Sequence, residues 1–120
     1  MLQALYDGTW LNRPGSELLL SWLAQATWRK GLVAKLPPDA EVAHKYGIRY
    51  LFDPDHPEMV PAGAPSLHLG DCGILYHPKR PMMVCVMTEA TTSAAAEGVI
   101  GDVAKAAWDA ATTLRSHSTC

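Results

Sequence analysis

The fold is decided by residues 68–88, which read HLGDCGILYHPKRPMMVCVMT. Residues 68–76 and 82–88 are rich in the apolar types that favour strands. The five residues between them, 77–81, contain two prolines and fit a hairpin turn. The stretch therefore predicts two antiparallel strands. The second strand is apolar at nearly every position, which predicts a central strand covered on both faces.

A third strand is predicted upstream, over residues 40–48, which read AEVAHKYGI. Val42, His44, Tyr46 and Ile48 alternate there with Ala43, Lys45 and Gly47. Residues 49–66 separate this strand from the hairpin and hold four prolines and one glycine. We expect an irregular loop there, long enough to need a functional or tethering role.

Two helices are predicted before the strands. Residues 1–8 look like the last turns of a helix that stops near Gly8, which suggests that the protein continues upstream of Met1. Asn12 suits an N-cap and Pro14 a first turn, so a second helix begins there. Its apolar spacing runs to about Trp28, and Gly31 then ends it.

A last helix is predicted after the hairpin. Ser93 is the candidate cap, and Glu97 lies in the first turn, where an anion meets the positive end of the helix dipole. The helix is expected to run to about Arg115. The residues expected to form its apolar stripe are Val99, Ile100, Val103, Ala107, Trp108, Ala111 and Leu114.

The predicted order is helix, helix, strand, strand, strand, helix. Three strands with short connections favour an antiparallel sheet with helices packed on it, an α+β fold, in one domain over residues 1–120. The four tryptophans, Trp10, Trp22, Trp28 and Trp108, are expected to pack in the core or at an interface.

Composition narrows the classes of partner. The net charge is −2, with 10 basic and 12 acidic residues and no block of like charge, so nothing indicates nucleic acid or an anionic membrane. No run has the length of a transmembrane span. No signal peptide follows Met1, so either the protein is cytoplasmic or its true front lies upstream.

The three cysteines, Cys72, Cys85 and Cys120, show no CxxC spacing. We expect two buried thiols in the strands and one loose terminal thiol, rather than a disulfide scaffold or a zinc site.

Lys45 is the first candidate for chemistry because lysine is depleted inside strands. Its neighbours on the same face, Ala43 and Gly47, are small and leave room for a ligand along the backbone. An ammonium there could bind a carboxylate or tune a nearby acid–base group. A lysine on a solvated strand face is the competing interpretation, and the triplet alone does not exclude it.

The histidines give weaker signals. His56 could join Asp53, Asp55 and Glu58 in a metal site, but a solvated acidic loop is the favoured interpretation. His68 and Asp71 could be acid–base groups, although hydrogen bonds that fix the strand end are favoured. No HExxH, GxSxG or SxxK is present, and Ser66 has no lysine at the offset of a serine nucleophile.

The segments VAHKYGI at 42–48 and 68–88 together resemble the end of the class A β-lactamase and D-alanyl-D-alanine peptidase superfamily of serine hydrolases. That superfamily carries SxxK, SDN and KTG motifs. Lys45-Tyr46-Gly47 falls where KTG stands. Residues 11–37 resemble the helix pair before that strand, and the last helix resembles the family's C-terminal helix. The resemblance covers nearly the whole chain.

The resemblance implies a site made by Lys45, Tyr46, Gly47 and Ile48. Lys45 would hold the carboxylate of a β-lactam or D-alanyl peptide, and the Ile48 N–H would be half of an oxyanion hole. No metal or cofactor is implied. The SxxK and SDN regions would lie upstream of Met1, in a complementing N-terminal half, so we expect the isolated chain to be inactive. An extracytoplasmic location is also implied.

Tyr46 departs from the family, which has Thr or Ser at this position. The small hydroxyl that touches the substrate carboxylate is replaced by a bulkier phenol that projects further. A non-catalytic relative that binds a peptidoglycan-like ligand or a partner protein is therefore the alternative. A third interpretation is an unrelated small α+β domain in which Lys45 is only a surface residue.

Overall fold

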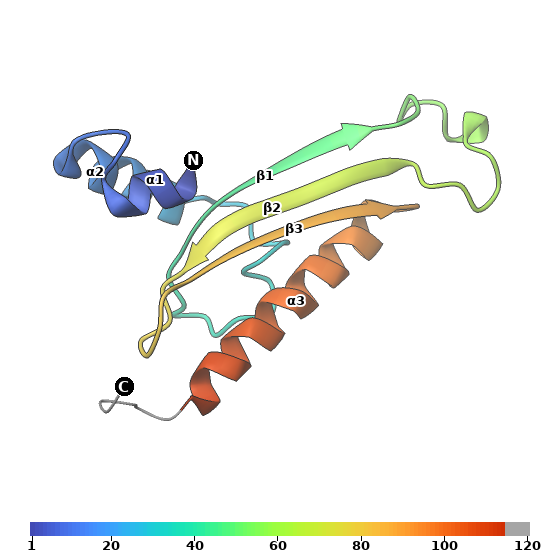
Figure 1. Cartoon of the computed structure of the whole chain (residues 1–120). Helices are drawn as coiled ribbons and strands as arrows, with labels where there is room; N and C mark the ends of the chain where they lie inside the picture. Colours follow the sequence, from blue (N-terminus) through green and yellow to red (C-terminus); the bar gives the residue numbers. More distant parts are fainter. Residues whose placement is uncertain (115–120) are drawn as a thin grey trace.

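Strand β2 (Leu67–Leu75) is the centre of a three-stranded sheet in the computed structural model, which describes residues 1–114 (Figure 1). Strand β1 (Val42–Tyr50) pairs with one side of β2 and strand β3 (Met82–Ala90) with the other, both antiparallel. The remaining elements are α1 (Leu2–Asp7), α2 (Arg13–Ala24), the 3₁₀ turn η1 (Pro57–Met59) and α3 (Ser93–Thr113). The predicted α+β architecture is confirmed.

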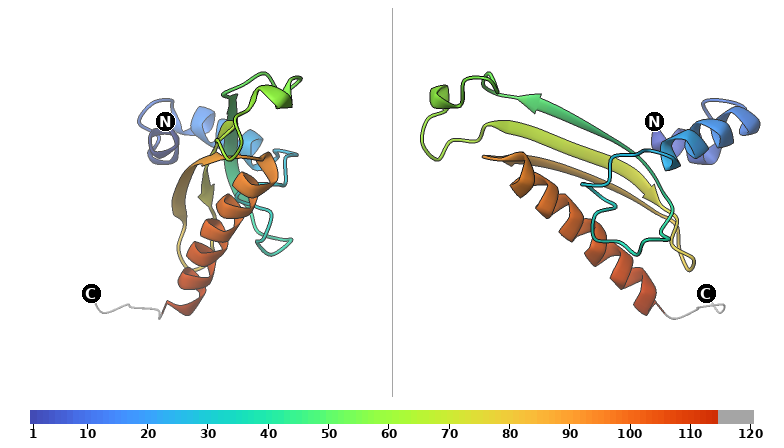
Figure 2. Two further views of the ribbon diagram at one scale, coloured as in Figure 1. Left: turned by 90° about the vertical axis from the view of Figure 1, so that its right-hand side faces the viewer. Right: turned by 180° about the vertical axis from the view of Figure 1, so that it is seen from behind.

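Helices cover the two faces of this sheet unequally (Figure 2). Helix α3 lies along one face, where Ala96, Ile100 and Ala104 meet buried leucines and valines of the sheet and of residues 32–36. Helices α1 and α2 pack on the other face near the start of β1, around Ala43 and Ile74. The rest of that second face is left open.

Helix α2 ends at Ala24, so the prediction that it runs to Trp28 and stops at Gly31 is wrong. Residues 25–41 form turns without a regular helix, and only one helix occupies the segment in which a pair was expected. The predicted start is correct, because the Asn12 side chain accepts a hydrogen bond from the Gly15 N–H at 2.7 Å. Beyond Ala24, tertiary packing outweighs the helical spacing of apolar residues, because the Trp28 ring stacks on Tyr46 of the sheet.

Helix α3 is capped by Thr92, not by Ser93, and Glu97 lies beyond its first turn. Its buried face is built from small residues with Ile100, while the predicted stripe members Val99 and Val103 are 51% and 42% exposed. The predicted end near Arg115 lies outside the described residues. No helix within residues 1–114 has the length and apolar character that crossing a bilayer requires.

Strand β3 is an edge strand among the described residues, so its predicted central place is not observed. Its side chains alternate between partly buried and exposed, and Met83 and Met87 are 44% and 73% exposed. The apolar sequence of β3 could not reveal its edge position. Such a sequence indicates burial, but it does not say whether the same chain or a partner covers the strand.

Cys72 and Cys85 form a disulfide, so the expectation of two free strand thiols is wrong. The register sets the two residues directly opposite each other, with their Cα atoms 4.0 Å apart. Such close approach is typical of a non-hydrogen-bonded antiparallel pair. The sequence spacing of 13 residues does not reveal it without the register. Cys120 lies outside the described residues.

Candidate functional site

The free edge of β1 is defined by the hydrogen bonds at its two ends. The Leu51 N–H donates to the Ser66 carbonyl at 2.8 Å, and the Tyr76 N–H donates to the Glu41 carbonyl at 3.0 Å. Backbone groups of alternate residues point to the same side of an antiparallel strand. The backbone N–H and C=O groups of the odd-numbered residues of β1 therefore point toward β2. Tyr46 and Ile48 turn their N–H and C=O groups toward the side where the described chain places no strand.

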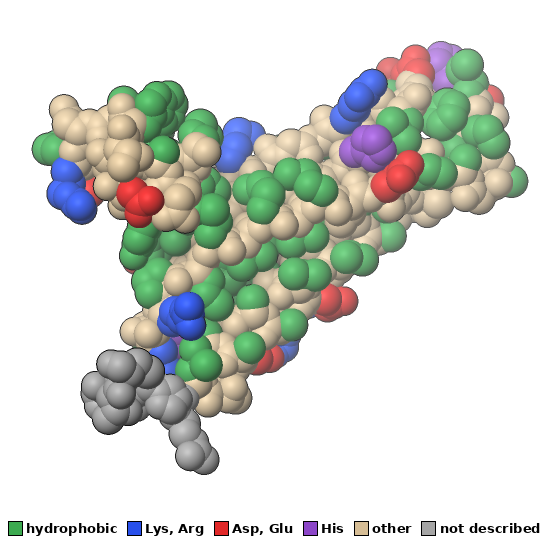
Figure 3. Space-filling view, viewed as in Figure 1, with side chains coloured by type: hydrophobic (Ala, Val, Ile, Leu, Met, Phe, Trp, Pro, Cys, Tyr) green, Lys and Arg blue, Asp and Glu red, His purple; other side chains and the backbone are tan. Residues whose placement is uncertain are grey.

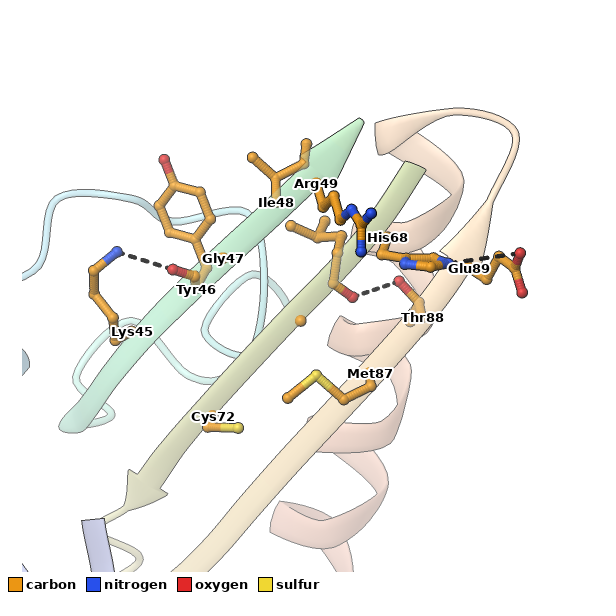
Figure 4. Close-up of a pocket in the computed structure, with 12 residues that line it drawn as sticks. Lys45, Tyr46, Gly47, Ile48, Arg49, His68, Cys72, Met87, Thr88 and Glu89 are labelled. Carbon is orange, nitrogen blue, oxygen red and sulfur yellow. Dashed lines mark hydrogen bonds and ion pairs between the residues drawn. The ribbon is translucent and has the colours of Figure 1, made fainter. Parts of the chain in front are cut away.

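Lys45 brings a cation to this edge (Figure 4). Its Nζ donates a hydrogen bond to the Tyr46 carbonyl at 2.9 Å and lies 4.8 Å from the centre of the Tyr46 ring. The side chain is exposed, and a Cβ at Gly47 would have no neighbour within 4 Å. The ammonium and the outward N–H of Ile48 are thus on one accessible edge.

Tyr46 is half-buried because its ring stacks on Trp28. The two ring centres are 4.0 Å apart, and the planes are inclined by 22°. The phenol was expected to project further than a threonine, and here its ring forms an aromatic wall beside Lys45. Trp28 could not be recognised in the sequence as part of this site, because its spacing is typical of a helix.

An open depression of about 680 Å³ occupies the uncovered part of the second face (Figure 4). Gly47 and Gly70 make its floor, and the side chain of Met87 lies over Gly70, where a Cβ would collide with the sulfur. Lys45 stands at one end. At the other end, the register aligns Arg49, His68 and Glu89 in one row across the sheet.

A buried acid–base pair lies beneath β1. His44 and Asp71 are 2% and 0% exposed, and His44 Nδ1 donates to both Asp71 carboxylate oxygens at 3.1 Å. Asp71 Oδ2 also accepts the Leu32 N–H at 2.9 Å. His44 Nε2 has no hydrogen-bond partner among the described residues. This pair could not be recognised in the sequence, because its members are 27 positions apart and meet only through the strand register.

The other predicted groups do not meet. His68 is exposed and lies 3.6 Å from Glu89, while Asp71 faces the opposite side of β2, so these two do not form an acid–base pair. His56 Nδ1 lies 3.0 Å from Glu58, and residues 1–114 contain no group of three metal-ligating side chains. Ser66 donates to the Thr91 carbonyl at 2.7 Å.

The chain resembles a known protein family over almost its whole length. A family model described as the beta-lactamase enzyme family matches residues 1–111. No curated protein sequence matches the chain significantly.

Solved structures share the fold. The TLA-3 extended-spectrum β-lactamase superposes with a TM-score of 0.74 at 24% identity, covering 91% of this chain and 38% of its own. A β-lactamase from Sphaerobacter thermophilus gives 0.70 and 21%, covering 96% and 39%. PBP-A gives 0.68 and 20%, covering 94% and 37%. The chain therefore spans less than two fifths of the length of these three structures.

Proposed function

Because the chain belongs to the beta-lactamase enzyme family, we propose that it is the C-terminal part of a serine hydrolase domain. All of residues 1–120 belong to this one domain, which is incomplete without an N-terminal half. The complete protein forms an acyl-enzyme on a serine with a β-lactam or a D-alanyl peptide. The coverage of 37–39% of the three related structures supports the incompleteness.

The observation that carries the proposal is the shared edge of Lys45 and Ile48. The Lys45 ammonium, which reaches the open side of β1, binds the substrate carboxylate by charge. The Ile48 N–H, which points to the same side, donates to the oxyanion of the tetrahedral intermediate. Gly47 keeps the backbone between them accessible. The nucleophile, its base and the second oxyanion donor come from the N-terminal half.

The coding sequence upstream of Met1 is the first test. We expect an in-frame SxxK followed by SDN, either in the same reading frame or in a neighbouring gene that encodes the complementing half. Absence of both motifs from these frames contradicts the hydrolase proposal.

The Ile48 N–H is tested in the complete protein with Ile48→Pro. On the backbone, proline removes only an outward N–H here, and an extended residue before it is tolerated. Tyr50→Pro is the matched control, because Tyr50 also has its backbone groups on the free edge. Acylation by a fluorescent penicillin should slow about 100-fold or more in Ile48→Pro. Equal rates in the two variants contradict the oxyanion role.

The isolated chain is expected to form no acyl-enzyme, because no described serine has an adjacent base and the family's nucleophile region is upstream. Incubation with the same penicillin probe followed by denaturing electrophoresis checks this. A covalent adduct that survives denaturation would show that a nucleophile lies within residues 1–120.

One observation favours a second candidate, a non-catalytic domain that binds a peptidoglycan-like ligand or a partner protein. Tyr46 replaces the small hydroxyl residue, and its stack on Trp28 fixes the ring beside Lys45. An upstream sequence that contains the rest of the family fold but lacks SxxK would establish this candidate over the hydrolase.

We also propose that the complete protein acts outside the cytoplasm. The Cys72–Cys85 disulfide supports this, since such bridges persist in oxidising compartments. Cell fractionation with an antibody against the chain checks the location.

A further inference from the structure

Asp71 joins three segments that are distant in sequence. Its carboxylate, fully buried in β2, accepts one hydrogen bond from the backbone of Leu32 and a shared one from His44 of β1. A buried carboxylate that accepts such bonds is costly to strip of its partners. Asp71 therefore fixes the 25–41 connection relative to β2, and its bond to His44 adds a side-chain link to the backbone pairing of β1 with β2.

The 25–41 connection links Asp71 to the free edge of β1 by a series of contacts. Gly31 lies against both Asp71 and Trp28, because a Cβ at Gly31 would collide with Asp71 Oδ2 and with the Trp28 ring. Trp28 in turn stacks on Tyr46, and the Lys45 ammonium lies against the same Tyr46 ring. Contacts thus run without a gap from the buried carboxylate to the exposed ammonium.

We propose that Asp71 and His44 are positioning residues, which hold Tyr46 and the Lys45 ammonium at the free edge of β1 through the 25–41 connection. This inference deepens the proposed function and rests on it, since Lys45 is the group that binds the substrate carboxylate. Neither residue touches the substrate. His44 acts by orienting the Asp71 carboxylate from β1, and Asp71 acts by holding the backbone of the connection that carries Trp28.

The chemistry of Asp71 and His44 indicates that they position other residues and do not merely fill space in the core. Leucine would fill the volume, and replacing a buried ionic pair with apolar residues is often neutral or stabilising. The protein instead keeps two ionisable groups at 2% or less exposure and tolerates an unpartnered His44 Nε2. Leucine cannot provide the directional hydrogen bonds that the pair makes to Leu32 and between β1 and β2.

The experiment is nuclear magnetic resonance of the isotope-labelled complete protein without ligand. Two signals report on the site: cross-peaks between the Trp28 and Tyr46 rings, and the upfield shift that the Tyr46 ring imposes on the Lys45 side chain. We expect both to be lost in Asp71→Leu and His44→Leu. Asp71→Asn, which keeps an acceptor oxygen for Leu32, should retain both. His68→Leu is the matched control, because His68 is an exposed histidine of the same sheet, and it should change neither.

Retention of both signals in folded Asp71→Leu and His44→Leu overturns the inference. If both variants fail to fold, a urea titration of the unaltered complete protein decides. Protection of the Leu32 amide and the Lys45 shift should disappear at the same urea concentration, and persistence of the Lys45 shift after that protection is lost overturns the inference. Penicillin labelling of the complete protein is measured separately. Failure to label contradicts the proposed function but leaves the positioning result unchanged.

Discussion

Tyr76 is the residue at which the protein's response to alkaline pH is expected to concentrate. It follows β2 directly, and partial burial, then the negative charge of Glu41, then Tyr6 raise the pKa of its phenol above the ordinary 10.0. Both burial and the neighbouring charge disfavour the phenolate. The folded state therefore favours the protonated form more strongly than the unfolded state does.

A raised pKa of this kind fixes the direction of the pH effect. The stabilisation from Tyr76 is complete below the unfolded pKa of about 10 and is lost as the pH rises through the folded value. The free energy of unfolding, measured in urea between pH 8 and 11.5, should fall less steeply in Tyr76→Phe than in the unaltered chain. Tyr50→Phe, at an exposed tyrosine, is the control. Identical slopes for Tyr76→Phe and the unaltered chain would contradict the prediction.

Single residues differ in how far the sequence reveals them. Lys45 and Tyr46 could be singled out because a charge inside an alternating strand is visible in a few letters. Trp28, His44 and Asp71 could not be assigned their roles, because each depends on a partner that is distant in sequence. Their contacts follow from the register and from the path of the 25–41 connection, which local patterns do not determine.

At the scale of the elements, the cap of α3 is the sharpest correction. The Thr92 hydroxyl accepts a hydrogen bond from the Ala95 N–H at 3.1 Å. Thr92→Ala should lower the free energy of unfolding by about 1 kcal/mol, measured by urea denaturation. Ser93→Ala is the matched control and should cost clearly less, because Ser93 is already inside the helix. Equal losses of unfolding free energy in the two variants would contradict the assignment of the cap to Thr92.

Element boundaries were predictable where local chemistry decides them. All three strands were found within two residues of their ends, since alternation and turn residues define them. The end of α2 was missed because the attraction between Trp28 and Tyr46 acts across the fold. The place of β3 was missed because an apolar run indicates burial without saying which chain provides the cover.

At the scale of the whole molecule, two apolar surfaces have no cover among residues 1–114. One follows the open edge of β3, where Met83 and Met87 are 44% and 73% exposed. The other belongs to the N-terminal part of the chain, where Trp10, between α1 and α2, is 57% exposed and Trp22, on α2, is 60% exposed. Figure 3 shows hydrophobic side chains spread over the sheet and α3 on the face in view. Patches of this kind indicate interaction surfaces.

The isolated chain is therefore expected to associate with itself. An open strand edge pairs readily with another chain, and a lysine on such an edge opposes pairing. Met87→Lys should lower the associated fraction in analytical ultracentrifugation. Met59→Lys is the matched control, because Met59 is 63% exposed but lies on the loop after β1. A well-behaved monomer at high concentration would contradict the expectation.

The disulfide between Cys72 and Cys85 has a consequence for how the hairpin can assemble. Sliding β3 along β2 by one residue would turn the two sulfurs to opposite faces of the sheet. In a paired hairpin the bridge can therefore form only when the two strands are in their native alignment. Once formed, the bond keeps Cys72 and Cys85 together even when the chain is denatured. The same molecule then refolds without having to find the alignment of β2 and β3 again.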